Sequence, residues 1–174
     1  YTDIRNSGRS MVDDPTLAEA LWRRVQHLVP QELTKHRWQK HGDTIWRPRG
    51  LNERLRFLRY NRGHYFVQHM DGNYPRPKQH PLHGDVSHLT MLIYLNDAFE
   101  GGELALEWGG ERLSTGQWGR VSTDIAPTPG LCVIHDHKIL HEAKCVVSGV
   151  RYCIRTDLMY APDEDEVEEK AASA

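Results

Sequence analysis

The sequence predicts a mainly β protein, a double-sheet jelly roll with an N-terminal helix packed on one outer face. Apolar residues recur at helical spacing only near the N-terminus. From about residue 51 onward they recur in short runs with a period of two, which is the spacing of strands. Turns rich in Gly, Pro and Asn separate these runs. No internal repeat and no second domain are visible, so residues 1–162 are expected to form one domain.

The helix has a recognisable start and end. Asp14 suits its N-cap, Pro15 suits its first turn, and Pro30 closes the segment. A second, shorter helical turn is expected over residues 31–38. The apolar face of the first helix, which must pack against another element, consists of Leu17, Leu21, Val25 and Leu28.

Eight short strands are expected after the helix. They span residues 51–60, 65–70, 89–95, 104–108, 119–123, 131–135, 141–147 and 151–160. The jelly-roll core therefore covers about residues 51–160. An immunoglobulin-like sandwich is the strongest competing topology, but it would leave the grouped histidines unexplained. Residues 163–174 are rich in acids and are expected to form a disordered tail.

The composition disfavours several classes of protein. The formal net charge is −2 and becomes slightly positive without the acidic tail, an excess too small to indicate nucleic-acid binding. No run of about 18 apolar residues is present, so we expect no membrane span. Cys132, Cys145 and Cys153 are odd in number and lie in apolar stretches, which favours buried free thiols and a cytoplasmic or nuclear location. The chain opens on Tyr1, which leaves a preceding targeting signal open.

A metal site is predicted around His69-x-Asp71. Side chains two apart on a strand share a face, so this imidazole and this carboxylate can converge on one ion. His141, at the start of a late strand, can supply a third ligand. Two histidines and one carboxylate leave coordination positions open, which is typical of non-haem iron(II) oxygenases. The histidines at positions 135 and 137 are interpreted as supporting or surface groups.

These residues are part of a pattern that resembles the prolyl 4-hydroxylase-like branch of the 2-oxoglutarate and iron(II)-dependent dioxygenases. The resemblance covers about residues 51–160 and implies the distorted jelly roll of that family, a double-stranded β-helix. It also implies that His69, Asp71 and His141 bind iron(II). The motifs that carry it are Arg59-Tyr60-x-x-Gly63-x-x-Phe66-x-x-His69-x-Asp71-Gly72, Leu92-Ile93-Tyr94-Leu95-Asn96, Phe99-Glu100-Gly101-Gly102-Glu103, Leu140-His141-Glu142, Gly149-Val150-Arg151-Tyr152 and Arg155-Thr156-Asp157.

The resemblance assigns further residues to the cosubstrate 2-oxoglutarate. Arg151, ten residues after His141, matches a basic residue that pairs with the distal carboxylate of 2-oxoglutarate. Many relatives have lysine there, whereas arginine offers a planar two-point grip. Tyr94 matches a tyrosine that hydrogen-bonds the same carboxylate. Tyr60 matches one that reaches the cosubstrate near the metal.

The implied reaction is the hydroxylation of a C–H bond by dioxygen, coupled to decarboxylation of 2-oxoglutarate to succinate, with ascorbate as an auxiliary reductant. We expect the substrate to be a prolyl residue or another amino-acid-like group. Phe66 stands where plant-type prolyl hydroxylases have tyrosine and Gln68 where proline is common, which disfavours a collagen-like or proline-rich peptide. The alternatives are a small-molecule oxygenase of natural-product type and a jelly-roll binding module without turnover.

Four residues are candidates for substrate contact. Strand parity places Arg56 and Arg155 inside the predicted barrel. Inward arginines suit an acidic or carboxylate-bearing substrate, and ion pairs at the barrel mouth would explain them equally well. Tyr74 and Arg76 follow the metal motif in a segment expected to act as a mobile lid, and residues 5–11 are a second lid candidate.

Overall fold

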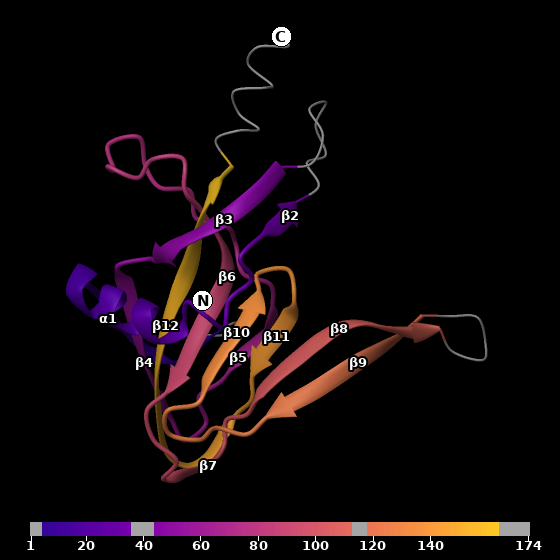
Figure 1. The fold of residues 1–174 in the computed structure, drawn as a ribbon. Helices are drawn as coiled ribbons and strands as arrows, with labels where there is room; N and C mark the ends of the chain where they lie inside the picture. The colour runs from indigo at the N-terminus through magenta and orange to yellow at the C-terminus, as the bar shows by residue number, and fades with distance from the viewer. Residues whose placement is uncertain (1–4, 36–43, 113–117, 164–174) are drawn as a thin grey trace.

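Antiparallel strands make up most of the computed structural model, which describes residues 5–35, 44–112 and 118–163 (Figure 1). In chain order its elements are β1 (Gly8–Asp13), α1 (Pro15–Val25), β2 (Leu33–Lys35), β3 (Thr44–Leu51), β4 (Arg54–Asn61), β5 (Phe66–His69), β6 (Val86–Tyr94), β7 (Phe99–Gly101), β8 (Leu104–Arg112), β9 (Trp118–Ile125), β10 (Cys132–Asp136), β11 (Leu140–Ala143) and β12 (Val146–Pro162). The predicted fold class, a mainly β jelly roll with an N-terminal helix, is confirmed.

Two antiparallel sheets form the layers of the jelly roll. In the larger sheet the strands β1-β4-β12-β3-β2 lie side by side, β6 also pairs with β12, and β10 pairs with β6. The smaller sheet has the order β5-β11-β8-β9. Its strands β8 and β9 form a long hairpin that projects away from the rest of the molecule (Figure 1).

The space between the two sheets holds the first of two hydrophobic clusters. Leu58 and Tyr60 of β4 and Leu92 of β6 enter it from the larger sheet, and Leu104 and Leu106 of β8 enter it from the smaller sheet. Their spacing of two along each strand is the reason that they share one face. Polar residues at the same parity on β4 and β12 therefore also point between the sheets, where the candidate site lies.

The second cluster lies on the other face of the larger sheet, where α1 packs. Ala18 and Val25 of α1 contact a layer that includes Met91 of β6 and Leu158 of β12. Both Met91 and Leu158 are fully buried, and burial of such a side chain stabilises a fold by about 1.5–3 kcal/mol. Because β6 is covered on both faces, nearly all of its residues are buried.

The start of α1 agrees with the predicted cap, but its end does not agree with the prediction. The Asp14 carboxylate accepts a hydrogen bond of 2.9 Å from the backbone N–H of Leu17, and Pro15 lies in the first turn. The helix ends at Val25, and Leu28 is 67% exposed, so its placement on the apolar face was wrong. Helical spacing no longer applies in the turn after Val25, and Val29 is buried instead.

Two other expectations about secondary structure were wrong. Residues 33–35 form β2, which pairs with β3, and not a helical turn, while residues 36–38 lie outside the described residues. The expected strand over residues 141–147 divides between β11 and β12, and β12 continues through the strand expected at 151–160. In both cases pairing with another strand, which local periodicity does not reveal, sets the boundaries.

Several smaller expectations concern the surface of the molecule. The three cysteines are free, but Cys145 is exposed because it lies in the turn between β11 and β12. Asp163 pairs with Arg47 at 2.8 Å, and the rest of the expected acidic tail lies outside the described residues. Within the described ranges, no helix has the length and apolar character needed to cross a membrane.

Candidate metal centre

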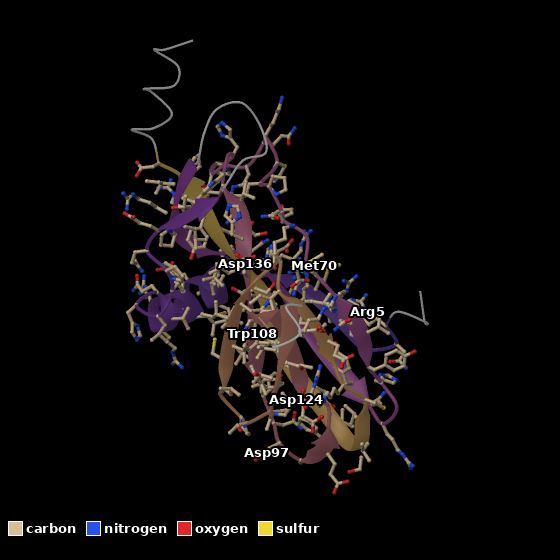
Figure 2. All side chains as sticks on the ribbon, turned by 90° about the vertical axis from the view of Figure 1, so that its right-hand side faces the viewer. Arg5, Met70, Asp97, Trp108, Asp124 and Asp136 are labelled. Atoms are coloured by element: carbon tan, nitrogen blue, oxygen red, sulfur yellow. The ribbon has the colours of Figure 1, made fainter. Side chains whose placement is uncertain are left out.

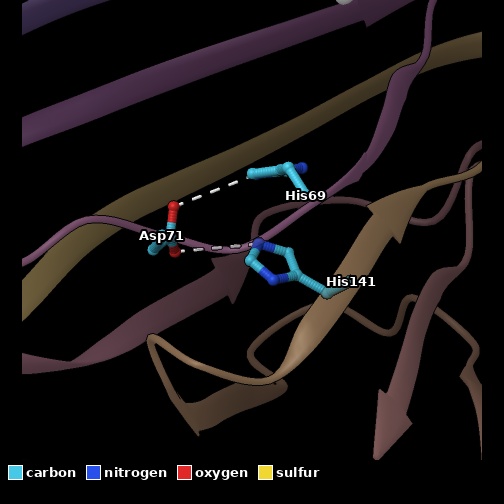
Figure 3. Close-up of side chains that lie close together, drawn as sticks. All are labelled: His69, Asp71 and His141. Carbon is cyan, nitrogen blue, oxygen red and sulfur yellow. Dashed lines mark ion pairs between the residues drawn. The ribbon is translucent and has the colours of Figure 1, made fainter.

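The structure brings together the three side chains predicted to bind a metal (Figure 3). His69 ends β5 and Asp71 follows it two residues later, while His141 lies in β11 directly opposite His69 in the strand register. The ligand atoms of the three residues all lie within 4.8 Å of one another. Asp71 lies between the two histidines, with its carboxylate oxygens 3.9 Å from His69 Nε2 and 3.7 Å from His141 Nε2. These residues could therefore hold one metal ion.

Backbone carbonyls orient both imidazole rings. Nδ1 of His69 lies 2.8 Å from the carbonyl oxygen of Val67, and Nδ1 of His141 lies 2.9 Å from that of Ile139. A hydrogen on each Nδ1 leaves the Nε2 lone pair directed at the shared point, which is how ligand histidines are commonly held. Burial lowers the pKa of both imidazoles, which favours the neutral, ligating form.

Polar contacts fix the carboxylate of Asp71. Arg155 lies 2.8 Å from Oδ1, and the hydroxyl of Thr90 donates a hydrogen bond of 2.5 Å to Oδ2. The backbone N–H of Asp71 donates to the carbonyl oxygen of His137. Burial alone would raise the pKa of Asp71, but Arg155, Thr90 and His141 outweigh it and hold this pKa well below its ordinary value. The carboxylate of Asp71 therefore stays anionic in the neutral pH range, as a metal ligand requires.

A chain of ion pairs extends from the metal centre across the floor of the barrel. Arg155 also lies 3.2 Å from Asp157, and Arg56 donates a 3.0 Å hydrogen bond to the other oxygen of Asp157. Asp157 is nearly fully buried, so this carboxylate balances two arginines in a place with little water. The candidate substrate residues Arg56 and Arg155 thus belong to one network with the candidate metal ligand Asp71.

The histidines of β10 and the turn after it support the centre from one side. The His135 ring lies 4.5 Å, centroid to centroid, from that of His141, and His135 is 5% exposed. His137 is buried with its Nε2 3.8 Å from Asp157. Both are therefore buried beside the candidate ligands rather than on the surface, and His135 also lines the pocket, which agrees with a supporting role.

Arg151 projects into the same space from β12 and is 1% exposed. Its guanidinium donates a hydrogen bond of 2.5 Å to the carbonyl oxygen of Gly102 and lies 3.9 Å from the centre of the Tyr60 ring. The guanidinium carbon lies 6.0 Å from the ring centre of Tyr94, which is fully buried. Arg151 Nε and the Tyr94 hydroxyl are buried without a hydrogen-bond partner. Within the described residues, no acid forms an ion pair with Arg151.

One pocket, open to solvent, connects the three candidate ligands with Arg151 and Tyr60. Arg56 and Arg155 also line it. Tyr94 does not line the pocket, but its ring lies close to the Arg151 guanidinium. The structure places the remaining two elsewhere. Tyr74 does not line the pocket, and Arg76 lies in a separate hollow near α1, where it binds Glu53 at 2.8 Å.

Sequence reasoning missed several residues of this pocket. Thr90, which holds the Asp71 carboxylate, shares its strand face with Leu92 and Tyr94, so strand parity was a usable signal. Arg5 and Arg9 also line the pocket; the sequence had suggested residues 5–11 as a lid but had assigned neither arginine to the site. Phe66, noted only as a departure from plant-type enzymes, stacks on His69 with ring centroids 3.6 Å apart.

Comparison with known proteins agrees with this geometry. Residues 55–156 match the family model of the 2OG-Fe(II) oxygenase superfamily. Comparison with curated proteins gave no match.

Several solved structures have a similar fold. A prolyl hydroxylase from Trichoplax adhaerens, in complex with a peptide fragment of the hypoxia inducible factor oxygen degradation domain, is 17% identical, with a TM-score of 0.57 over 100% of this chain and 69% of that one. A prolyl-4-hydroxylase from Pseudomonas putida is 17% identical, with a TM-score of 0.53 over 89% and 72% of the two chains. An oxidoreductase of the 2OG-Fe(II) oxygenase family from Burkholderia pseudomallei is 18% identical, with a TM-score of 0.53 over 89% and 67%.

Proposed function

Because the chain belongs to the 2OG-Fe(II) oxygenase superfamily, we propose that it hydroxylates a C–H bond of a prolyl or other amino-acid-like substrate. His69, Asp71 and His141 hold the iron, and Arg151 binds the distal carboxylate of 2-oxoglutarate. The observation that carries the proposal is the pocket that contains all four side chains. When bound, iron(II) together with 2-oxoglutarate and dioxygen supplies the oxidation, which is coupled to decarboxylation of 2-oxoglutarate to succinate.

The donor set fits iron(II). Two neutral imidazoles and one carboxylate on one face leave positions open for a cosubstrate and dioxygen. Each Nε2 lies beyond hydrogen-bond distance of the Asp71 oxygens, so Asp71 does not satisfy these lone pairs. Arg155 and Thr90 hold the carboxylate in place, which supports the orientation of the ligand.

The surroundings of Arg151 fit the carboxylate of 2-oxoglutarate. A buried guanidinium without a carboxylate partner in the described residues is costly, and a bound carboxylate removes that cost. The Tyr94 hydroxyl has no hydrogen-bond partner among the described residues, and its ring centre lies 6.0 Å from the guanidinium carbon, so it can donate to the same carboxylate. Tyr60, beneath the guanidinium, keeps the charged group fixed by a cation–π contact.

The residues of the protein position the substrate and limit the access of water to the pocket. Leu92 and Leu104 line the pocket together with Phe66, so water is excluded from much of its wall. Phe66, stacked on His69, offers an apolar surface beside the metal centre against which the carbon skeleton of a substrate can pack. The likeness to prolyl hydroxylases makes prolyl peptides the first substrates to test.

The test is iron-dependent succinate formation by the purified protein with 2-oxoglutarate and ascorbate. Prolyl peptides and a pool of small metabolites are supplied separately, and Asp71→Ala serves as the inactive control. Stimulation by a peptide supports the proposal, whereas stimulation only by a metabolite supports an oxygenase of natural-product type. Absence of both iron(II) binding and 2-oxoglutarate decarboxylation would leave a binding module and overturn the enzymatic proposal.

A further inference from the structure

The pocket contains more positively charged side chains than are needed to bind the metal and the cosubstrate. Among its lining residues in the described part of the chain, five are arginines and Asp71 is the one acid. Iron(II), Asp71, doubly charged 2-oxoglutarate and Arg151 together carry no net charge. Arg56 and Arg155 both pair with Asp157, so their two positive charges face one further negative charge, and an excess of positive charge remains in this part of the pocket.

Arg5 and Arg9 add two further charges at the side of the pocket formed by the N-terminal segment. Neither arginine forms an ion pair with any acid among the described residues. The guanidinium of Arg5 instead lies 5.4 Å from the ring centre of Phe66, beside the metal centre. Figure 2 shows Arg5 on the same face of the molecule as Met70, the residue between two of the metal ligands.

The N-terminal segment is anchored to both sheets, so these charges have a defined place. β1 pairs along β4 of the larger sheet, and Arg5 forms an isolated bridge with Phe66 of the smaller sheet. The side chain of Asn6 accepts a 2.8 Å hydrogen bond from the backbone N–H of Tyr65 and donates one of 3.1 Å to the carbonyl oxygen of Gly63. The segment therefore crosses the open side of the barrel and carries its arginines over the pocket.

We propose that Arg5 and Arg9 bind a carboxylate of the substrate, so that the substrate is an acidic, amino-acid-like compound. This inference rests on the proposed function, because it concerns the substrate of the same pocket. An unpaired guanidinium at a pocket wall binds carboxylates with a planar two-point geometry. The excess positive charge on the floor attracts the same group and repels a cationic substrate.

The experiment compares matched acidic and neutral ligands by calorimetry. The protein is loaded with Mn(II), which does not support turnover, and with 2-oxoglutarate. The acidic probes are glutamate and aspartate with an acetylated α-amine and an amidated α-carboxyl group, and the neutral probes are the same derivatives of glutamine and asparagine. The members of each pair differ in charge but hardly in shape. At least one acidic probe is expected to bind about tenfold more tightly than its amide.

Two variants assign that preference to the N-terminal segment. In the double variant Arg5→Gln, Arg9→Gln the acidic and neutral probes are expected to bind within about twofold of each other. Arg59→Gln is the matched control, because Arg59 is exposed on β4 opposite Gly8 and does not line the pocket. It should keep the full preference. Thermal unfolding of each variant checks that the fold is retained.

The outcomes separate this proposal from the proposed function. Equal binding of acidic and neutral probes, including no binding of either, overturns the acidic substrate. A preference that persists in the double variant overturns the role of Arg5 and Arg9. If the Mn(II)-loaded wild-type protein does not bind 2-oxoglutarate in the first titration, the proposed function fails instead.

Discussion

Replacing Arg151 with methionine should have opposite effects on ligand binding and on stability. Arg151 is 1% exposed, yet within the described residues its hydrogen-bond acceptor is the neutral carbonyl of Gly102, and its Nε has no partner. The ligand-free protein therefore keeps a buried charge without a counter-ion. Such an arrangement is expected where binding of an anion, rather than folding, is the function of the side chain.

The two magnitudes follow from this environment. Loss of one partner from a buried, hydrogen-bonded charge pair costs about 2–5 kcal/mol, so the Kd for 2-oxoglutarate should rise about 30-fold or more. Replacement of a buried charge by an apolar side chain of similar length is often neutral or stabilising by about 1–4 kcal/mol. The cation–π contact with Tyr60 and the bond to Gly102 offset part of that gain. The free energy of unfolding of the ligand-free Arg151→Met variant should therefore be unchanged or higher.

Two measurements on the same preparations check the prediction. Calorimetry of the Mn(II)-loaded proteins gives the affinity for 2-oxoglutarate, and urea unfolding without ligand gives the stability. A 2-oxoglutarate concentration 100-fold above the wild-type Kd should stabilise the wild-type protein by about 2.7 kcal/mol, whereas a variant that binds about 30-fold more weakly should gain only about 0.9 kcal/mol. Arg155→Met is the comparison, because Arg155 lies in the same pocket but is paired with Asp71 and Asp157.

A variant that binds 2-oxoglutarate within threefold of the wild-type protein would refute the role of Arg151. If Arg155→Met weakened 2-oxoglutarate binding in its place, Arg155 would be the residue that holds the distal carboxylate. A ligand-free variant that unfolds far more easily than the wild-type protein would show that Arg151 supports the fold itself.

Three further predictions concern the metal, the backbone and one buried acid. Asp71→Ala should abolish both iron content, measured by elemental analysis, and turnover, because it removes the anionic ligand. Gly149→Ala should unfold at a temperature several degrees lower than Gly84→Ala: both glycines have positive φ, but a Cβ at Gly149 meets the carbonyl oxygen of Ala98, whereas Gly84 has open space. Burial raises the pKa of Asp85, so the charged carboxylate destabilises the folded state near pH 7. Asp85→Asn should therefore raise the free energy of unfolding near pH 7 and leave it unchanged near pH 3, where Asp85 is protonated in the folded and the unfolded state. Equal effects at the two pH values would refute this.

Much of the fold could be read from short stretches of sequence. The cap at Asp14 and the period-two runs depend on neighbouring residues, and the structure has them where the pattern placed them. The end of α1, the strand β2 and the break between β11 and β12 were predicted wrongly, and for the strands the reason is that pairing with other strands sets their boundaries. β2, for example, pairs with residues 44–46 of β3, and local periodicity had assigned neither segment to a strand.

The residues of the candidate site also fall into those that the sequence predicted and those that only the tertiary structure located. His69 and Asp71 are two apart on one chain segment, so strand geometry alone predicted that they could converge, and spacing in a family pattern suggested His141 and Arg151.

Only the tertiary structure placed His141 opposite His69, Arg155 on the carboxylate of Asp71, and Arg5 over the pocket. These contacts join residues from about 60 to 85 positions apart, and the packing of two sheets, rather than any local preference of the chain, decides which strands meet. The sequence by itself therefore determined which side chains can bind a metal. The packing of the sheets decided which charged side chains, such as Arg5 and Arg155, surround them.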